Sequence, residues 1–152
     1  MNKLILMVGA PGSGKSTWSS KYLTNNPHTV ILSSDKFRAI FGKDENDQSV
    51  TGRVFSHIKI ETDEYLKKGN DVIIDATNVD KKSRKDWVYL AKKHNAKLIA
   101  YIFLMDRDTL VKRNQERGNR GGRNVPPEII DLLLSRYVPP TKEEGFDEIN
   151  FV

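Results

Sequence analysis

Short apolar runs alternate along the chain with longer segments in which apolar residues recur every three or four positions. The runs are rich in Val, Ile and Leu, which is typical of strands buried on both faces, and they predict strands at Leu4–Val8, Thr29–Leu32, Val72–Asp75, Leu98–Phe103 and Glu148–Val152. The periodic segments predict helices at Ser16–Thr24, Ser34–Phe41, Val54–Lys67, Lys81–His94, Arg107–Arg117 and Pro126–Tyr137. This alternation indicates an α/β fold with a parallel sheet covered on both faces, and such sheets bind ligands beyond the carboxyl ends of their strands.

The length of 152 residues fits one domain, and we expect residues 1–152 to form it. A polar connection spans 42–52, and the glycine-rich stretch 118–124 is expected to be mobile. There is no cysteine, no apolar run is long enough to cross a membrane, and the N-terminal apolar run is too short for a signal peptide. We therefore expect a cytoplasmic protein, in the host cytoplasm if it is viral, with no membrane contact and no obligatory protein partner.

The segment between the first strand and the first helix, Gly9–Ser16, matches the pattern G-x-x-x-x-G-K-S. Glycines let the backbone turn its N–H groups toward phosphate oxygens, and the following helix adds its positive N-terminal end. Lys15 is expected to reach the β and γ phosphates, and the Ser16 hydroxyl to ligate Mg²⁺. The motif thus predicts a site for ATP, or another nucleoside triphosphate, with Mg²⁺. We assign its binding residues as Gly12, Ser13, Gly14, Lys15, Ser16 and Thr17.

The second strand is followed by Asp35 and Arg38, which lie one helical turn apart and share a helix face. Phosphoryl transfer to a hydroxyl needs a carboxylate that accepts the hydroxyl proton and cations that hold anionic groups in line. Asp35 fits the role of general base, and Arg38 fits the role of the cation. An alternative is that Asp35 only caps the helix that follows it.

The third strand ends in Asp75, which is placed to order Mg²⁺ with Ser16, or only to form a hydrogen bond to the glycine-rich loop. Thr77 and Asn78 follow at the same edge and are candidate substrate contacts. The alternative for this pair is a turn that caps the next helix.

Arg113 and Arg117 are four residues apart on the helix that leads into the glycine-rich stretch, so both can point the same way. Guanidinium groups bind phosphate oxygens bidentately and stabilise charge on a transferring phosphoryl group. We therefore predict a lid segment at about 113–125, with Arg113 and Arg117 as catalytic residues. For Arg120 and Arg123, an exposed loop position and a ligand contact are left as equal alternatives.

The basic residues exceed the acidic ones by 25 to 20, a net charge of +5 that favours an anionic partner such as nucleic acid. Many of the lysines fall in the predicted helix Lys81–His94. Because Trp87, Leu90 and Ala91 define its buried side, the basic residues are expected to form a solvated outer face.

The glycine-rich loop, S-D-K-F-R from Ser34, D-A-T-N from Asp75 and K-R-N-x-x-R-G from Lys112 occur in the order and spacing of a known family. Across almost its whole length the chain resembles the kinase domain of phage and bacterial polynucleotide kinases. The resemblance implies a P-loop NTPase fold of the kinase type, a three-layer sandwich with a five-stranded parallel sheet in the order 2-3-1-4-5.

The same resemblance implies that Lys15 and Ser16 hold ATP and Mg²⁺, and that Asp35 is the base for a nucleic acid 5′-hydroxyl. It also implies that Arg38 and Thr77 contact the acceptor phosphate. Three departures are visible: the chain lacks the D-x-D-G-T signature of a phosphatase domain, its D-A-T-N differs from the D-T-N of the phage enzyme, and its loop around Gly121 is longer.

Three functions follow as hypotheses. The first is an ATP-dependent polynucleotide 5′-hydroxyl kinase that acts on DNA or RNA ends. The second is a kinase of metabolites or nucleosides that uses the same donor site. The third is a nucleotide-binding module without catalysis, which the combination of Lys15, Asp35 and the lid arginines disfavours.

Overall fold

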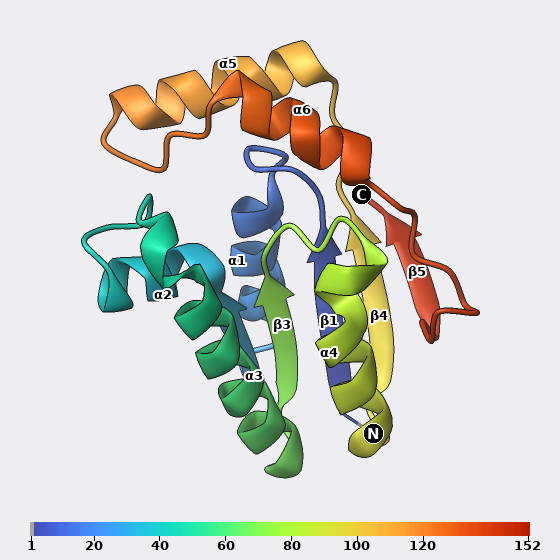
Figure 1. Cartoon of the computed structure of the whole chain (residues 1–152). Coiled ribbons are helices and arrows are strands. Elements are labelled where there is room, and N and C mark those ends of the chain that lie inside the picture. Colours follow the sequence, from blue (N-terminus) through green and yellow to red (C-terminus); the bar gives the residue numbers. More distant parts are fainter. Residues whose placement is uncertain (1) are drawn as a thin grey trace.

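The computed structural model describes residues 2–152 and contains one parallel five-stranded sheet in the order β2-β3-β1-β4-β5 (Figure 1). The strands are β1 (Lys3–Val8), β2 (Thr29–Ser33), β3 (Asp71–Asp75), β4 (Lys97–Ile102) and β5 (Glu148–Phe151). In the central register, Leu6 pairs with Ile74 of β3 on one side and with Ala100 of β4 on the other. The α/β class and the strand order are confirmed.

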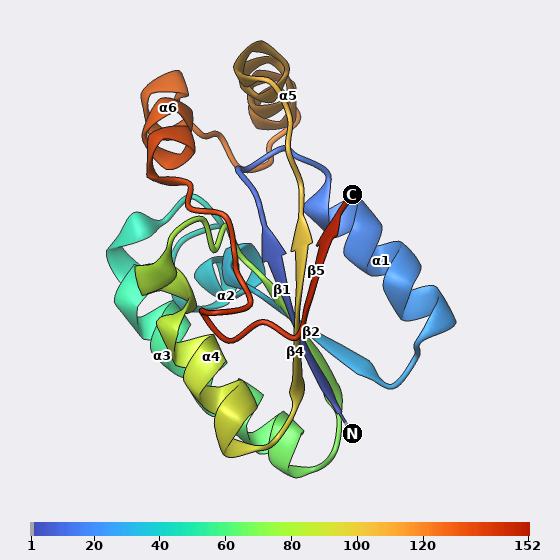
Figure 2. The same ribbon diagram turned by 90° about the vertical axis from the view of Figure 1, so that its right-hand side faces the viewer.

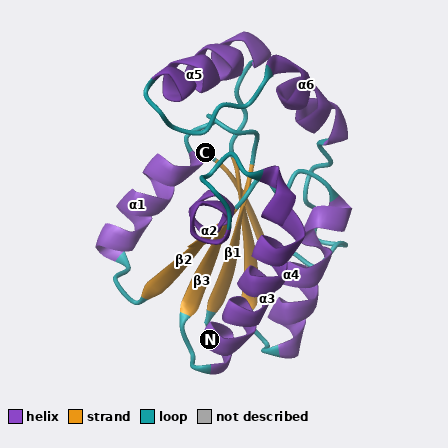
Figure 3. Ribbon diagram, turned by 60° about the vertical axis from the view of Figure 1, so that its left-hand side comes forward, coloured by secondary structure: helices purple, strands orange, loops and turns teal. Residues whose placement is uncertain are grey.

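Helices cover both faces of the sheet and also its carboxyl edge. The helices are α1 (Lys15–Asn25), α2 (Ser34–Phe41), α3 (Thr51–Lys67), α4 (Lys81–Lys93), α5 (Arg107–Asn119) and α6 (Pro127–Arg136), with a short 3₁₀ turn at Gln48–Val50. Figure 2 shows α3 and α4 on one face and α1 on the other. Figure 3 shows α5 and α6 beyond the carboxyl ends of the strands, above the loop that joins β1 to α1.

The central strand β1 is buried on both sides, as its unbroken apolar run predicted. Leu4 and Leu6 pack in the larger core cluster, with Trp87 and Leu90 of α4. Ile5 and Met7 point the other way and pack with Phe103, next to Trp18 of α1. The alternation of side chains along a strand thus divides one apolar run between two cores.

Two element boundaries differ from the predictions by more than one residue. Helix α3 begins at Thr51, three residues before Val54, because the turn at Gln48–Val50 leads directly into it. Helix α5 continues to Asn119, two residues past Arg117, so the loop that follows is shorter than predicted. No helix within residues 2–152 is long and apolar enough to cross a membrane.

Helix α4 confirms the predicted buried side but corrects one residue of its basic face. Trp87, Leu90 and Ala91 are buried as expected. Arg84, which the pattern placed among solvated lysines, is completely buried and binds Glu144 through Nε and Nη2 at 2.8 and 2.9 Å. Its Nη1 also donates to the Asn78 carbonyl at 3.0 Å. A buried, bidentate ion pair therefore connects α4, the segment after β3 and the segment before β5.

Candidate active site

The P-loop, residues 9–16, has the backbone that its glycines predict. Gly12 and Gly14 have φ angles of 86° and 99°, a region that L side chains rarely adopt. A Cβ atom on Gly12 would lie 2.9 Å from Nδ2 of Asn114, and one on Gly9 would lie 2.8 Å from the Phe103 carbonyl oxygen. Helix α1 begins at Lys15. The loop backbone therefore requires glycine at these positions, and it leads directly into a helix N-terminus.

Lys15 is buried, and its ammonium group donates to the carbonyl oxygens of Gly9 at 2.6 Å and Ala10 at 3.2 Å. Burial lowers the pKa of this group to about 8, since desolvation penalises its charged form more than the neighbouring Asp75 carboxylate favours it. The nearby carboxylates thus offset only part of the desolvation cost of the buried ammonium. A phosphate group would remove that cost.

Ser16 and Asp75 meet beside the P-loop, where the serine hydroxyl donates to Oδ2 of Asp75 at 3.2 Å. Burial raises the pKa of the Asp75 carboxyl, while the charge of Lys15 opposes that rise. The hydrogen bond to the loop that the sequence suggested is thus present. Within residues 2–152 no group of three or more His, Cys, Asp or Glu side chains forms a metal cluster, so a cation here would need phosphate or water oxygens as further ligands.

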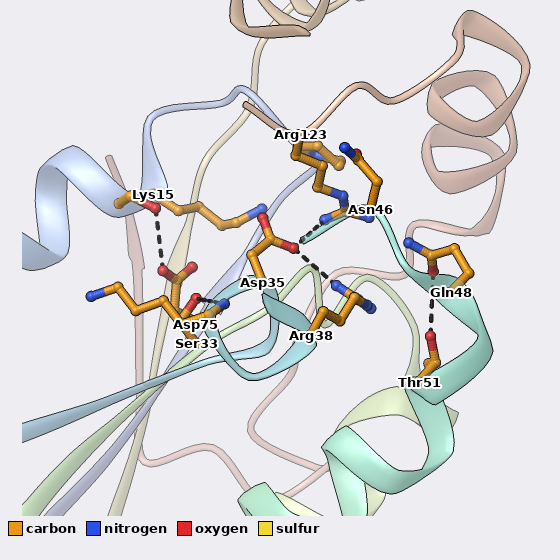
Figure 4. A network of polar contacts seen from close by, with 12 residues as sticks. Lys15, Ser33, Asp35, Arg38, Asn46, Gln48, Thr51, Asp75 and Arg123 are labelled. Atoms are coloured by element: carbon orange, nitrogen blue, oxygen red, sulfur yellow. Dashed lines mark hydrogen bonds and ion pairs between the residues drawn. The ribbon is translucent and has the colours of Figure 1, made fainter. Parts of the chain in front are cut away.

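Asp35 is held by arginines from two directions, as Figure 4 shows. Its Oδ1 accepts from Nη1 of Arg38 at 2.9 Å and from Nη1 of Arg123 at 2.8 Å. The alternative role of Asp35 as a helix cap is wrong, because the side chain of Ser33 caps α2 by accepting from the Lys36 amide at 3.4 Å. Asp35 and its two arginines therefore form a charged cluster beside the P-loop.

The lid arginines lie over the same loop. Nη1 of Arg113 donates to the Gly12 carbonyl at 3.2 Å, and Nη2 of Arg117 donates to Oδ1 of Asn114 at 2.7 Å. Asn114 lies between the two arginines in sequence, is buried and donates to the Pro11 carbonyl at 2.8 Å. This asparagine, which the sequence analysis did not single out, anchors α5 to the P-loop; its spacing of four residues from the buried Leu110 is the signal that could have found it.

Thr77 and Asn78 have different positions, although they are adjacent. Thr77 is half-buried and lines the cavity beside the P-loop, and its carbonyl accepts from the Gly9 amide at 3.0 Å. Asn78 is buried, donates to the Met7 carbonyl at 2.9 Å and accepts from the Trp87 indole at 3.2 Å. This geometry gives the Asn78 side chain a structural role in place of the predicted substrate contact. Neither residue caps α4, because Asp80 does.

Most of these residues line one cavity of about 440 Å³, which we call the P-loop pocket, whereas Arg38, Asn78 and Asn114 lie outside its lining. It is lined by the predicted residues Gly12, Gly14, Lys15, Ser16, Thr17, Asp35, Asp75, Thr77, Arg113 and Arg117, and also by Arg120 and Arg123. Ser13 is buried and does not line the pocket; its hydroxyl donates to the Ala10 carbonyl at 2.7 Å. Arg123 is not an exposed loop residue, because its side chain is 14% exposed and pairs with Asp35; its contact with a ligand stays a prediction. The pocket brings a carboxylate, a lysine and several arginines to one place.

The family model that matches this chain is described as an AAA domain, and the match covers residues 4–140. A protein of Acanthamoeba polyphaga mimivirus, named as a bifunctional polynucleotide phosphatase/kinase, is 30% identical over 99% of this chain and 33% of its own length. The L-seryl-tRNA(Sec) kinase of Methanococcus maripaludis is 28% identical over 95% of this chain and 56% of its own length. This chain therefore spans only part of either relative.

Solved structures agree with the observed fold. A chain in the Pnkp1/Rnl/Hen1 RNA repair complex superposes with a TM-score of 0.78 and 30% identity, over 89% of this chain and 43% of its own length. A structure from Chloroflexus aurantiacus has a TM-score of 0.81 at 21% identity, over 99% of this chain and 87% of its own, and it supports the fold alone. With the P-loop geometry and the sheet order, these matches show that the chain belongs to the AAA domain family and is a P-loop kinase domain similar to those of polynucleotide kinases.

Proposed function

We propose that this chain transfers the γ-phosphate of ATP to the 5′-hydroxyl ends of DNA or RNA. The observation that carries the proposal is the position of Asp35. This carboxylate is fixed by Arg38 and Arg123 and faces the pocket that also contains Lys15 of the P-loop. A hydroxyl placed between Asp35 and a nucleotide on the P-loop would meet a proton acceptor on one side and a phosphoryl group on the other.

The donor side of the pocket suits a triphosphate with Mg²⁺. The Ser16 hydroxyl and the Asp75 carboxylate lie 3.2 Å apart beside the P-loop, and Mg²⁺ in such sites takes one or two protein oxygens together with phosphate and water oxygens. The residues present therefore fit the ion without a dedicated protein cage. When bound, Mg²⁺ would neutralise negative charge on the phosphates. Lys15 would move its hydrogen bonds from the loop carbonyls to phosphate oxygens.

In the proposed reaction the Asp35 carboxylate accepts the proton of the acceptor hydroxyl. The hydroxyl oxygen forms a bond to the γ-phosphorus, the bond from that phosphorus to the β,γ-bridging oxygen breaks, and ADP leaves with the bonding electrons. Arg113 and Arg117 would stabilise the charge that spreads over the transferring group. Arg38 and the Thr77 hydroxyl would together hold the acceptor phosphate.

Two buried nitrogen atoms support an anionic ligand at these arginines. Nε of Arg38 and Nε of Arg117 have no hydrogen-bond partner among residues 2–152. Buried donors of this kind are rare in folded proteins, because an unmade hydrogen bond leaves the desolvation cost unpaid. Phosphate oxygens on the donor and acceptor sides would satisfy both. We also propose that the lid segment, residues 113–125, closes the pocket during transfer.

A kinase of small molecules is the second candidate. The match to the L-seryl-tRNA(Sec) kinase, at a similar level of identity, bears on it only because it shows that the acceptor differs among relatives with the same donor motif. In that case the donor half of the pocket would work in the same way, while the acceptor would be held by other contacts. A nucleotide-binding module without catalysis is the least supported, because it has no need for an arginine-fixed carboxylate at the pocket.

The test is an assay with γ-labelled ATP and Mg²⁺, with a 5′-hydroxyl oligonucleotide or a panel of nucleosides and metabolites as acceptor. We expect label on the oligonucleotide end. Asp35→Ala should bind ATP normally and lose about 10²- to 10⁴-fold in transfer rate, the usual contribution of a general base. Asp108→Ala is the matched control, since it removes a carboxylate whose side chain is 92% exposed and lies outside the pocket.

Each outcome separates the candidates. Label on a metabolite and none on the oligonucleotide would favour the small-molecule kinase. ATP binding without label on any acceptor would favour the non-catalytic module. Full transfer by the Asp35→Ala variant would show that another group accepts the proton.

A further inference from the structure

A second hollow opens beside the P-loop pocket, between α3 and α4, which lie next to each other in Figures 1 and 3. It has a volume of about 340 Å³, and we call it the α3–α4 groove. Ala76 and Thr77 line both the groove and the P-loop pocket. A molecule seated at Thr77 therefore lies beside both hollows.

Lysines lie on both sides of the groove. Lys59 comes from α3, and Lys82 comes from the first turn of α4; both side chains are exposed. Asp86 also lines the groove, and Nζ of Lys59 lies 3.4 Å from its carboxylate, so these two charges offset each other in part and Lys82 gives the groove its net positive charge. Lys82 additionally borders a neighbouring hollow together with Lys81 and Lys85. The positive surface thus continues from the groove along the start of α4.

The remaining groove wall suits a flexible polar chain with apolar parts. Ser56 and Ser83 present exposed hydroxyl groups, which can donate to phosphate oxygens. Phe55 offers a half-buried apolar surface, on which a sugar or base can pack. At Gly52 a Cβ atom would meet nothing within 4 Å, so this end of the groove is open.

We propose that the α3–α4 groove binds the single-stranded sugar-phosphate chain of a polynucleotide acceptor beyond its first nucleotide, with Lys59 and Lys82 as phosphate contacts. The inference rests on the proposed kinase function and specifies its substrate, because a metabolite held at Asp35 would not reach these lysines. Phosphate contacts of this type position a strand without reading its sequence. The groove therefore favours longer acceptors of any sequence over single nucleotides.

The experiment compares a 5′-hydroxyl oligonucleotide of about twenty nucleotides, a length that exceeds ordinary single-strand site sizes, with a nucleoside 3′-monophosphate. We expect the double variant Lys59→Ala/Lys82→Ala to raise KM for the oligonucleotide roughly tenfold and to leave KM for the mononucleotide unchanged. The slope of log affinity against log salt should fall by about 1.4 for two lost single-strand contacts. Lys67→Ala/Lys92→Ala is the matched control, with exposed lysines on the same helices but outside the groove.

The failures are distinguishable. If the wild-type protein labels neither acceptor, the proposed function is wrong; fluorescence anisotropy with a labelled oligonucleotide then still tests the groove by itself. If the groove variant and the control variant bind and phosphorylate the oligonucleotide equally well, the inference is overturned. Equal loss with both acceptors would overturn it too, since that result would place the lysines at the first nucleotide.

Discussion

The depressed pKa of Lys15 makes a quantitative prediction about nucleotide binding. In the free protein this ammonium is buried against carbonyl oxygens, and its pKa is about 8, compared with 10.5 for an ordinary lysine. A triphosphate beside it would favour the charged form and raise the pKa again. Below pH 8 the lysine is already protonated when ATP arrives. Above pH 8 it must take up a proton during binding, so we expect affinity to fall as pH rises.

The magnitude follows from the two pKa values. If the bound lysine titrates at or above 10.5, the dissociation constant for ATP should increase about tenfold between pH 7 and pH 9. Over the same interval, proton uptake per bound ATP should rise from about 0.1 to about 0.9. The effect of this lysine on folding stability has the opposite pH dependence to its effect on ATP affinity. Between pH 8 and pH 10.5 the unfolded chain binds more protons at this residue, so its contribution makes the folded state more stable as pH rises.

Isothermal titration calorimetry in buffers with different ionisation enthalpies measures both the affinity and the proton uptake. Lys15→Met is the control: its weaker binding should lack this uptake, and subtracting its pH profile removes the titration of ATP itself. Proton uptake that stays near zero at pH 9 in the wild-type protein would refute the reasoning. So would an affinity that changes with pH equally in the variant.

Two further changes test the framework around the pocket. Gly12→Ala should weaken ATP binding at least tenfold, because its backbone has φ 86° and the added Cβ would lie 2.9 Å from Asn114. Gly52→Ala is the control and should leave ATP binding intact, since the space around Gly52 is open. Equal effects of the two substitutions on ATP binding would contradict the argument. Arg84→Met should lower the free energy of unfolding by about 3–5 kcal/mol in chemical denaturation, because it leaves the buried Glu144 carboxylate without its partner. A loss below about 1 kcal/mol, as for an exposed pair, would show that water reaches Glu144.

Local patterns predicted the parts of the site that depend on short stretches of chain. The P-loop was visible because its glycines, lysine and serine are contiguous between a strand and a helix. The Asp35–Arg38 ion pair was visible because helix geometry brings residues three apart together. The position of these groups at one edge followed from the parallel sheet, in which all carboxyl ends face the same way.

Contacts between distant segments were not predictable in the same way. Arg84 has the charge type of its lysine neighbours, but its spacing of three residues from Trp87 and seven from Ala91 places it on the buried side of α4. Its partner Glu144 lies 60 residues later, and a local pattern does not reveal that pairing. Arg123 lies in a glycine-rich loop that has no periodicity, and it finds Asp35 across 88 residues. Asn78 resembles a polar residue at a ligand edge, and only the packing of Trp87 against it shows that it is buried. In each case the deciding information is which surfaces meet in the fold.

The contacts of the lid loop with the opposite side of the cleft have a consequence for how fast ligands exchange. Arg123 reaches Asp35, and the Asn124 amide donates to Oδ1 of Asn46 at 2.8 Å. A partly exposed ion pair and one exposed hydrogen bond together hold the loop by roughly 1–2 kcal/mol, so we expect it to stand open in about one molecule in ten. Hydrogen exchange of the Asn124 amide should then be slowed only about tenfold, and stronger protection would contradict this estimate. With such weak closure, ATP would enter and ADP would leave without waiting for a rare opening event.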